Sequence, residues 1–501
     1  MIVSRLSLVA LMMTAVPAMA QPVSFTSPAV SPSLSAEAAL GRFYATPRSP
    51  LWLQGTTLSP AGQLLLARLR TADHEGYAAG PTLAAQVDAA LVAAGTPPLS
   101  IDRLLSTGLV GLVQTLNGPI PGGRYYHLST KPLVELPDRT LHLAARAPDL
   151  AAHVTTSLRK SRFYEELRTA MLAEAAANGG QVDPRLAANL QRARLLPASG
   201  RYLFVNPATA ELMLVNDGIV QDKMRVVVGT AQTPTHPMAS RIYFATLNPY
   251  WNVAEDLVRK IVAPQVVAQG LSYVKSRNYE VVDKYGEGAT VIPAASVDWK
   301  AVLAGTQQVK MRQKPSATNS MGKMKVPFAN DYGIFLHDTV NKPQFAKIDR
   351  ATSNGCIRLE DASKLARWLF GTEPSATGTQ PDQSMRLPDP ISLYVAYLTA
   401  QPTGTKYCLC ARCLWARFDR ERCRTRLGRR RAPAWQLLRA SPKGRRCIFS
   451  TRPRSSSARA PVAPARSAFD AKNILNMAGL MAARAARAAT SCSKPSPASI
   501  R

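Results

Sequence analysis

Cysteine is scarce in most of this sequence. Of the 501 residues seven are cysteine, and Cys356 is the only one among the first 400. A single thiol cannot form a disulfide within that part of the chain, which excludes a disulfide-held fold there. In an exported protein, a lone thiol of this kind is a candidate nucleophile.

Long apolar runs are also lacking, except at the start of the chain. Arg5 is followed by an apolar run from Leu6 to Val16 and by Ala18-Met19-Ala20, which matches a signal-peptidase site. We predict a signal peptide over residues 1–20, a mature protein without a transmembrane anchor, and a location in the periplasm. The alternative is an uncleaved anchor, but the run is shorter than the about 20 residues that a spanning helix needs.

Acidic residues are few in the C-terminal region. Residues 401–501 hold 23 lysines and arginines against 3 acidic residues, and they contain the six remaining cysteines. We predict a basic Cys/Arg-rich tail that is disordered or frameshifted, since a high-GC gene read out of frame gives excess Arg, Ala, Pro, Ser and Cys. Two alternatives stay open: an arm that binds polyanions, and a metal site at Cys408, Cys410 and Cys413, whose spacing is only loosely zinc-like.

Apolar residues recur at helix spacing over the first part of the mature chain. A segment that begins at Pro60 follows Ser59, a predicted N-cap, and the runs Leu104–Leu116 and Ala151–Ala173 show the same spacing. We predict a flexible start over residues 21–40, followed by a helical domain and linker over residues 41–199.

The period changes near residue 200. Short β-type runs begin at Tyr202 and Glu211, and the second ends at Asn216-Asp217-Gly218, a strong hairpin signal. Strand-like runs return before His337 and from Ile391, with helical and polar segments between. We predict an α+β protein, in which a helical N-terminal domain precedes a β-rich domain over residues 200–400 with an insertion over residues 255–330.

Two residue types suited to thiol acyl transfer lie near each other in this β-rich region. His337-Asp338-Thr339 ends a predicted strand, and Ser353-Asn354-Gly355-Cys356-Ile357-Arg358 follows after a loop. A free thiol has a pKa of about 8.5, so a neighbouring imidazole is needed to form thiolate at neutral pH. Gly355 permits a tight turn before the nucleophile. Taken alone, one cysteine is more often a small buried residue, and one histidine more often a core or surface residue, than part of a catalytic pair.

The surrounding residues make the pattern specific. It resembles the signature of the L,D-transpeptidase (YkuD-like) family, a histidine followed downstream by Ser-x-Gly-Cys-x-Arg. The larger YcbB-like Gram-negative members also have Lys, Phe and Arg between the two parts, and these stand here at Lys342, Phe345 and Arg350. The helical domain resembles that group's scaffold domain, and residues 255–330 lie where its capping insertion lies.

The sequence departs from the family pattern in three ways. Asn354 stands where relatives often have His or Ser, and Val340 stands where Pro is frequent. A separate peptidoglycan-binding repeat domain is also missing, which weakens any expectation of independent wall anchoring.

The resemblance implies a peptidoglycan L,D-transpeptidase. Cys356 would attack a tetrapeptide stem and release D-alanine, while His337 would take the thiol proton. The amine of a second stem would then resolve the thioester into a 3-3 cross-link. The N–H groups of Gly355 and Cys356 are expected to stabilise the oxyanion, and Arg358 is expected to orient the loop or a substrate carboxylate.

Four further residues are expected to bind substrate or to support the loop: Ser353, Asn354, Asp338 and Thr339. We predict that the Ser353 hydroxyl stabilises the turn. Asp338 is expected to pair with a loop amide or with Arg350.

Two other functions remain open at this point. The same acyl-enzyme could pass to water, which would make the protein an L,D-carboxypeptidase or an amidase. The chain could also be a non-catalytic protein that binds the wall or polyanions, although the His337 and Cys356 pair argues against this. The expected partners are peptidoglycan stem peptides rather than a specific nucleic acid, and no metal or organic cofactor is implied.

Overall fold

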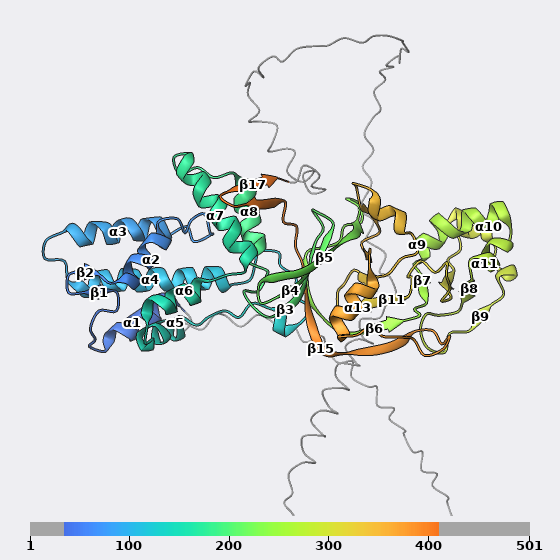
Figure 1. Ribbon diagram of the computed structural model, residues 1–501, viewed down its shortest axis with the longest axis horizontal. Helices are drawn as coiled ribbons and strands as arrows, with labels where there is room; N and C mark the ends of the chain where they lie inside the picture. Colours follow the sequence, from blue (N-terminus) through green and yellow to red (C-terminus); the bar gives the residue numbers. More distant parts are fainter. Residues whose placement is uncertain (1–34, 410–501) are drawn as a thin grey trace, which may run out of the picture.

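The secondary structure is arranged as three bodies in a row (Figure 1). The computed structural model describes residues 35–409. Helices lie at one end, a large sheet lies in the middle, and a smaller sheet with its own helices lies at the other end. This confirms the predicted α+β class, in which the helical part precedes the β-rich part. The predicted signal peptide and residues 410–501 of the predicted tail lie outside the described residues.

The helical body starts earlier and is more divided than the sequence indicates. Its first helix begins at Ala36, inside the segment predicted to be flexible, and Ser35 caps it. Ser59 caps the second helix as predicted, since its side chain accepts from the Gly62 N–H at 3.2 Å. The run Ala151–Ala173 is two helices, because Ser161 caps a new start within it. The helices are α1 (Ala36–Ala45), α2 (Pro60–Leu69), α3 (Gly80–Val92), α4 (Pro98–Asn117), α5 (Pro137–Arg146), α6 (Leu150–Leu158), α7 (Arg162–Ala177) and α8 (Pro184–Ala193).

The main sheet has nine strands in the order β13-β5-β14-β12-β11-β6-β15-β3-β4. Strand β4, the last in this order, also pairs with β5, the second. The strands from β5 to β4 therefore close into a ring. The predicted hairpin joins β4 to β5, with positive φ at Asp217 and Gly218. The strands are β3 (Arg201–Asn206), β4 (Glu211–Asn216), β5 (Ile219–Gly229), β6 (Met238–Leu247), β11 (Met324–Pro327), β12 (Phe335–His337), β13 (Ala351–Ser353), β14 (Ile357–Leu359) and β15 (Gln383–Val395).

Both faces of the sheet are buried along β3. Tyr202 and Phe204 belong to one apolar core with helices α7 and α8, and Phe204 packs edge-on against Phe163 of α7. Leu203 and Val205 belong to a second core on the other side, together with α13 (Ala362–Phe370). Because successive side chains of a strand point to opposite faces, a strand buried on both sides reads as an unbroken apolar run. The helical body and one face of the main sheet therefore share a single apolar core.

The insertion forms a separate body with its own core. A four-stranded sheet of order β7-β10-β8-β9 packs its apolar side chains, such as Val253 and Met311, against short helices. The predicted end of the insertion at residue 330 is too late, because Met324 and Val326 of β11 already belong to the main core. Its elements are β7 (Trp251–Val253), α9 (Glu255–Leu257), a π-helical turn (Val258–Val262), α10 (Ala263–Gln269), α11 (Ser272–Ser276), β8 (Tyr279–Val282), β9 (Val291–Ile292), α12 (Trp299–Ala304) and β10 (Lys310–Gln313).

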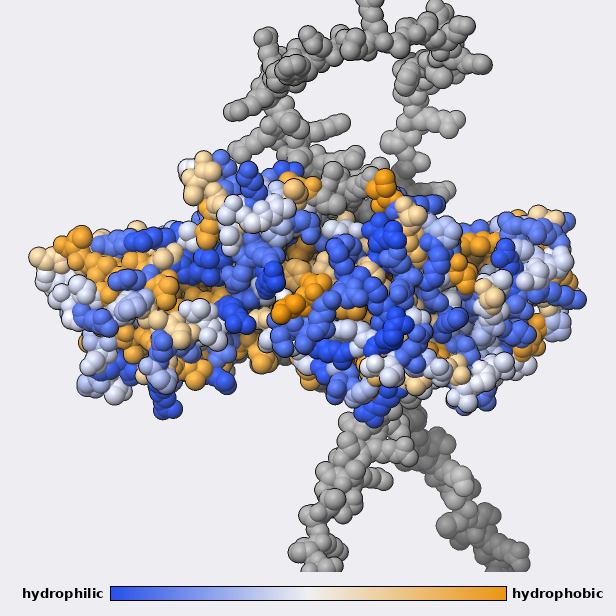
Figure 2. All heavy atoms as spheres, in the orientation of Figure 1, coloured by the Kyte–Doolittle hydropathy of each residue, from blue (hydrophilic) through white to orange (hydrophobic). Residues whose placement is uncertain are grey.

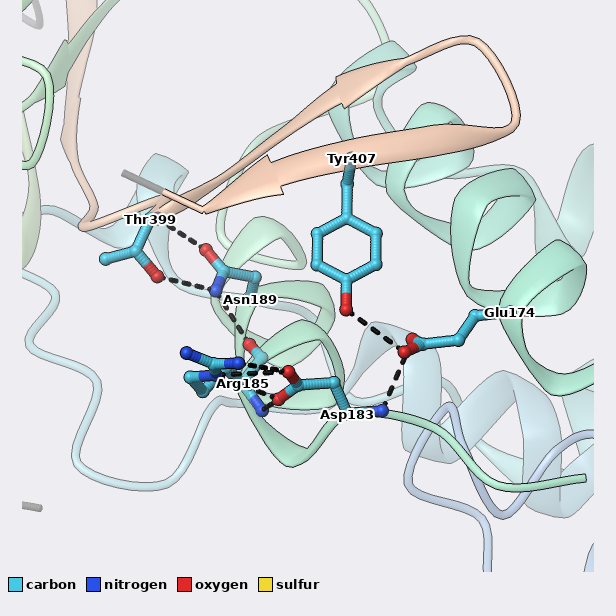
Figure 3. A network of polar contacts seen from close by, with 6 residues as sticks. All are labelled: Glu174, Asp183, Arg185, Asn189, Thr399 and Tyr407. Atoms are coloured by element: carbon cyan, nitrogen blue, oxygen red, sulfur yellow. Dashed lines mark hydrogen bonds and ion pairs between the residues drawn. The ribbon is translucent and has the colours of Figure 1, made fainter. Parts of the chain in front are cut away.

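The start of the predicted tail is folded rather than disordered. Strands β16 (Ala400–Thr403) and β17 (Lys406–Leu409) form a hairpin that packs on α7 and α8 (Figure 3). The Tyr407 hydroxyl donates to Glu174 at 3.1 Å. Asn189, which is fully buried, accepts from the N–H groups of Thr399 and Ala400 at 2.6 and 3.0 Å. The predicted boundary at residue 401 is therefore wrong, because this chain segment closes the sheet onto the helical body.

Apolar side chains are exposed at several positions of the helical body. On the face drawn in Figure 2, hydrophobic residues gather over the helices, while hydrophilic residues cover much of the middle. Exposed examples are Leu64, Leu99 and Leu143. Among residues 35–409, no helix has the length and apolar character needed to cross a membrane.

We predict that Asn189→Ala lowers the free energy of unfolding by about 3 kcal/mol, because it leaves the buried N–H of Ala400 and the half-buried N–H of Thr399 without acceptors. Asn178→Ala, at an exposed position after α7, serves as the matched control and should change stability little. Urea unfolding of both variants checks this. Equal stability of the Asn189 variant and the parent would contradict the role assigned to the hairpin contact.

Candidate active site

The register between two short strands places the predicted nucleophile and the predicted base on the same face of the sheet. Strands β12 and β14 are parallel, with Leu336 opposite Ile357 and His337 opposite Arg358. Leu336 and Ile357 are fully buried in the core below the sheet. Because side chains alternate along a strand, His337 and Arg358 point to the opposite side, as does Cys356 one residue before β14. The Sγ of Cys356 lies 3.9 Å from the carbonyl oxygen of Gly333.

A tight turn between β13 and β14 presents Cys356. The Ser353 hydroxyl donates to the Cys356 carbonyl at 2.6 Å and accepts from the Gly355 N–H at 3.1 Å. Gly355 has φ of 108°, a conformation that side-chain-bearing residues rarely adopt. Ser353 thus occupies the position of a turn-stabilising hydroxyl. Asn354 is exposed at the top of this turn.

Thr235 holds the same turn from behind. Its hydroxyl donates to the Gly355 carbonyl at 2.7 Å and accepts from the Gly229 N–H, at the end of β5, at 3.0 Å. Thr235 is fully buried, and its carbonyl accepts from the Tyr397 hydroxyl at 2.9 Å. Thr235 was not among the residues predicted for the site, although Thr230 and Thr233 lie close to it in the sequence after β5.

The expected oxyanion donors are not equivalent in the structure. The Gly355 N–H already donates to the Ser353 hydroxyl inside the turn. An amide that is engaged in this way is not available to an oxyanion, so the expectation for Gly355 is corrected. The Cys356 N–H remains the candidate donor, and Gly355 contributes through its backbone conformation.

Residues 200–379 match the family model described as the L,D-transpeptidase catalytic domain (YkuD), and residues 38–171 match that of the scaffold domain. The chain thus contains an L,D-transpeptidase catalytic domain preceded by a scaffold domain. A candidate L,D-transpeptidase of Haemophilus influenzae is 32% identical over 190 residues, which cover 38% of this chain and 37% of that protein.

Solved structures of L,D-transpeptidases are more distant. The one from Mycobacterium smegmatis is 12% identical, covers 39% of this chain and 58% of that chain, and has a TM-score of 0.20. A cysteine-to-serine mutant from Enterococcus faecium is 13% identical, covers 43% and 64%, and has a TM-score of 0.21. In each comparison the match spans less than two thirds of the relative's length.

The electrostatics of the L,D-transpeptidase site favour a neutral thiol and a neutral imidazole at rest. Burial and, to a smaller extent, the Arg358 charge lower the pKa of His337 to about 3. Burial raises the pKa of the Cys356 thiol, partly offset by the Phe335 N–H and by the charges of Arg358 and Lys325. Both shifts oppose a resting thiolate–imidazolium pair.

The tautomer of His337 follows from its contact with the backbone. Nδ1 lies 2.5 Å from the carbonyl oxygen of Asp338, an acceptor, so Nδ1 carries the hydrogen. In the neutral ring, Nε2 is then the nitrogen with a lone pair. His337 is therefore suited to take a proton through Nε2 when the thiol attacks.

Arg358 and Thr339 support the loop that connects the two strands of the site. Arg358 Nη1 donates to the Gln344 side-chain carbonyl at 2.9 Å, and the Gln344 amide donates to the Thr339 hydroxyl at 3.5 Å. Thr339, which is buried, also accepts from the Asn341 N–H at 3.2 Å. Gln344 was not selected from the sequence, and its place in the short helix between Lys342 and Ala346 gave no signal of this role.

Asp338 anchors the other side of this loop. Its carboxylate accepts from the Lys323 N–H at 2.9 Å and pairs with the Lys342 ammonium at 2.8 Å. Lys342 also donates to the Glu360 carbonyl at 2.8 Å, just after β14. Asp338 was expected to pair with a loop amide or with Arg350. The Lys323 N–H is such a loop amide. Within residues 35–409, no group of three His, Cys, Asp or Glu side chains is placed to hold a metal ion.

We predict that Thr235→Val speeds hydrogen exchange at the Gly229 amide and lowers the free energy of unfolding by about 2 kcal/mol, because both hydrogen-bond partners of the hydroxyl stay buried without it. Exchange mass spectrometry checks this, and Thr235→Ser should behave as the parent. An unchanged Gly229 exchange rate in a folded Val variant would show that Thr235 does not hold the turn.

Proposed function

We propose that this protein is a peptidoglycan L,D-transpeptidase that forms 3-3 cross-links through a thioester on Cys356. The observation that carries the proposal is the placement of Cys356 and His337 on one face of the paired strands β12 and β14, within an L,D-transpeptidase catalytic domain. The predicted signal peptide places the reaction in the periplasm, where peptidoglycan is found.

The first half-reaction makes the acyl-enzyme. His337 Nε2 takes the thiol proton as Cys356 Sγ attacks the carbonyl carbon of the third residue of a tetrapeptide stem. The oxyanion of the tetrahedral intermediate accepts from the Cys356 N–H. When the intermediate collapses, the C–N bond to D-alanine breaks, and His337 returns the proton to the leaving amine. The products are a thioester and free D-alanine.

The second half-reaction moves the acyl group to an amine. The side-chain amine of the diamino acid in another stem attacks the thioester carbonyl, and His337 takes a proton from that amine. The C–S bond breaks, and Cys356 leaves as thiolate and regains the proton from His337. The peptide bond that forms joins two third residues, which is a 3-3 cross-link.

The surroundings of the site suit an anionic peptide. Two cationic side chains, Lys325 and Arg358, flank His337 on the neighbouring strands. Stem peptides carry several carboxylates, and fixed cations favour their approach. We also propose that the body formed by residues 251–313 caps the bound stem, because its strand β7 follows β6, and β6 pairs directly with β11 of the site.

Product analysis tests the proposed function. With a disaccharide-tetrapeptide alone, the full chain is expected to release D-alanine and form a cross-linked dimer, both detected by liquid chromatography with mass spectrometry. Cys356→Ala should abolish both products, because no other group in the site forms the thioester. D-alanine release that gives only the hydrolysed tripeptide would assign an L,D-carboxypeptidase instead. Equal D-alanine release by the Ala variant would contradict the nucleophile.

A further inference from the structure

Three charged or titratable side chains lie abreast on neighbouring strands of the main sheet. Lys325 of β11 is opposite His337 in the antiparallel pair β11–β12, and His337 is opposite Arg358 in the parallel pair β12–β14. Residues directly opposite each other in neighbouring strands point to the same face. Lys325 and Arg358 therefore flank His337 from the two sides, on the face that also holds Cys356.

Lys325 is an unusual residue for its position in β11. Its chain neighbours Met324 and Val326 are buried in the main core, while Lys325 itself is half-buried, with its ammonium 5.7 Å from the centre of the Phe335 ring. Burial lowers the pKa of Lys325, and nearby Asp382 and Cys356 oppose that shift. Holding a charged group partly out of water costs free energy.

We propose that Lys325 is a positioning residue for the reaction, holding a positive charge on the face that also presents Cys356, where it stabilises the negative sulfur formed when the thiol loses its proton. This inference rests on the proposed function. It concerns a residue that the sequence pattern did not assign to the site. Arg358 supplies a second positive charge from the other side, but its guanidinium is also bound to Gln344 of the loop.

The arrangement also affects His337. Two flanking cations disfavour a third positive charge, so the imidazolium formed during attack is a strong acid that gives up its proton readily. In the proposed reaction that proton goes to the leaving amine of D-alanine. Lys325 thus favours negative charge on sulfur and proton release from His337 to the leaving amine, while the same charge lowers the basicity of His337 in the first proton transfer.

The charged groups around Lys325 come from each neighbouring element. Strand β12 and its end bring His337 and Asp338, the turn before β14 brings Cys356, and Asp382 comes from the residue before β15. Thr246 of β6, opposite Lys325 on the other side, is uncharged. Removing Lys325 therefore leaves Arg358 as the cation that still acts on Cys356.

The pH dependence of thiol alkylation tests this proposal. Iodoacetamide labelling of Cys356 in the full chain, followed by site-resolved mass spectrometry, gives the pH midpoint of thiolate formation without any acyl transfer. Lys325→Met is expected to raise that midpoint by about one unit, so that labelling below it slows about tenfold. Lys325→Arg is expected to keep the parent midpoint, because it keeps the charge.

Two controls separate charge from structure. Lys223→Met removes an exposed lysine from β5 of the same sheet and should leave the midpoint unchanged. Lys325→Gln provides a second neutral variant, and circular dichroism with thermal unfolding shows which variants are folded. The proposal is overturned if folded Met and Gln variants both keep the parent midpoint, or if Lys325→Arg shifts it as far as Lys325→Met does.

The outcome for Lys325 is independent of the outcome for the proposed function. D-alanine release by the parent enzyme is measured beside the alkylation profile. An unshifted midpoint together with D-alanine release would remove the role of Lys325 and leave the transpeptidase assignment intact. A parent enzyme that releases no D-alanine would remove the assignment, whatever the alkylation profile shows.

Discussion

The site depends on one pairing, between the parallel strands β12 and β14. That register puts His337 opposite Arg358 and leaves Cys356 on the same face, while Leu336 and Ile357 are fixed in the core below. A shift of one residue would turn Cys356 or His337 into that core. The turn held by Ser353 and Thr235, and the loop held by Asp338 and Arg358, both preserve this register.

Burial sets the chemistry that this geometry can perform. It lowers the pKa of His337 and raises that of Cys356, so the resting pair is neutral. Negative charge then develops on sulfur only as the substrate is attacked, and fixed cations beside the site are most effective in such a dehydrated setting. The row of Lys325, His337 and Arg358 gives a physical reason why a half-buried thiol with a raised pKa can still react in this position.

The sequence predicted elements of the fold correctly where residues close together in the chain stabilise them. Ser59 caps a helix because its hydroxyl reaches the next turn, and Asp217-Gly218 form a hairpin because both adopt positive φ. The motif likewise pointed to Cys356 and His337. Thr235 and Lys325 were missed as site residues because strand pairing, not sequence proximity, brings them there. The hairpin after residue 400 was missed because its stabilising partners, such as Glu174, lie far away in the sequence.

The central claim is that Cys356 is the group that carries the acyl intermediate. The most direct measurement is intact-mass analysis of the full chain quenched in acid during reaction with a tetrapeptide donor, followed by peptide mapping. The account predicts a mass increase equal to the donor minus D-alanine, located on the peptide that contains Cys356. An acyl group on a different residue, or donor turnover without any covalent adduct on a folded enzyme, would contradict it.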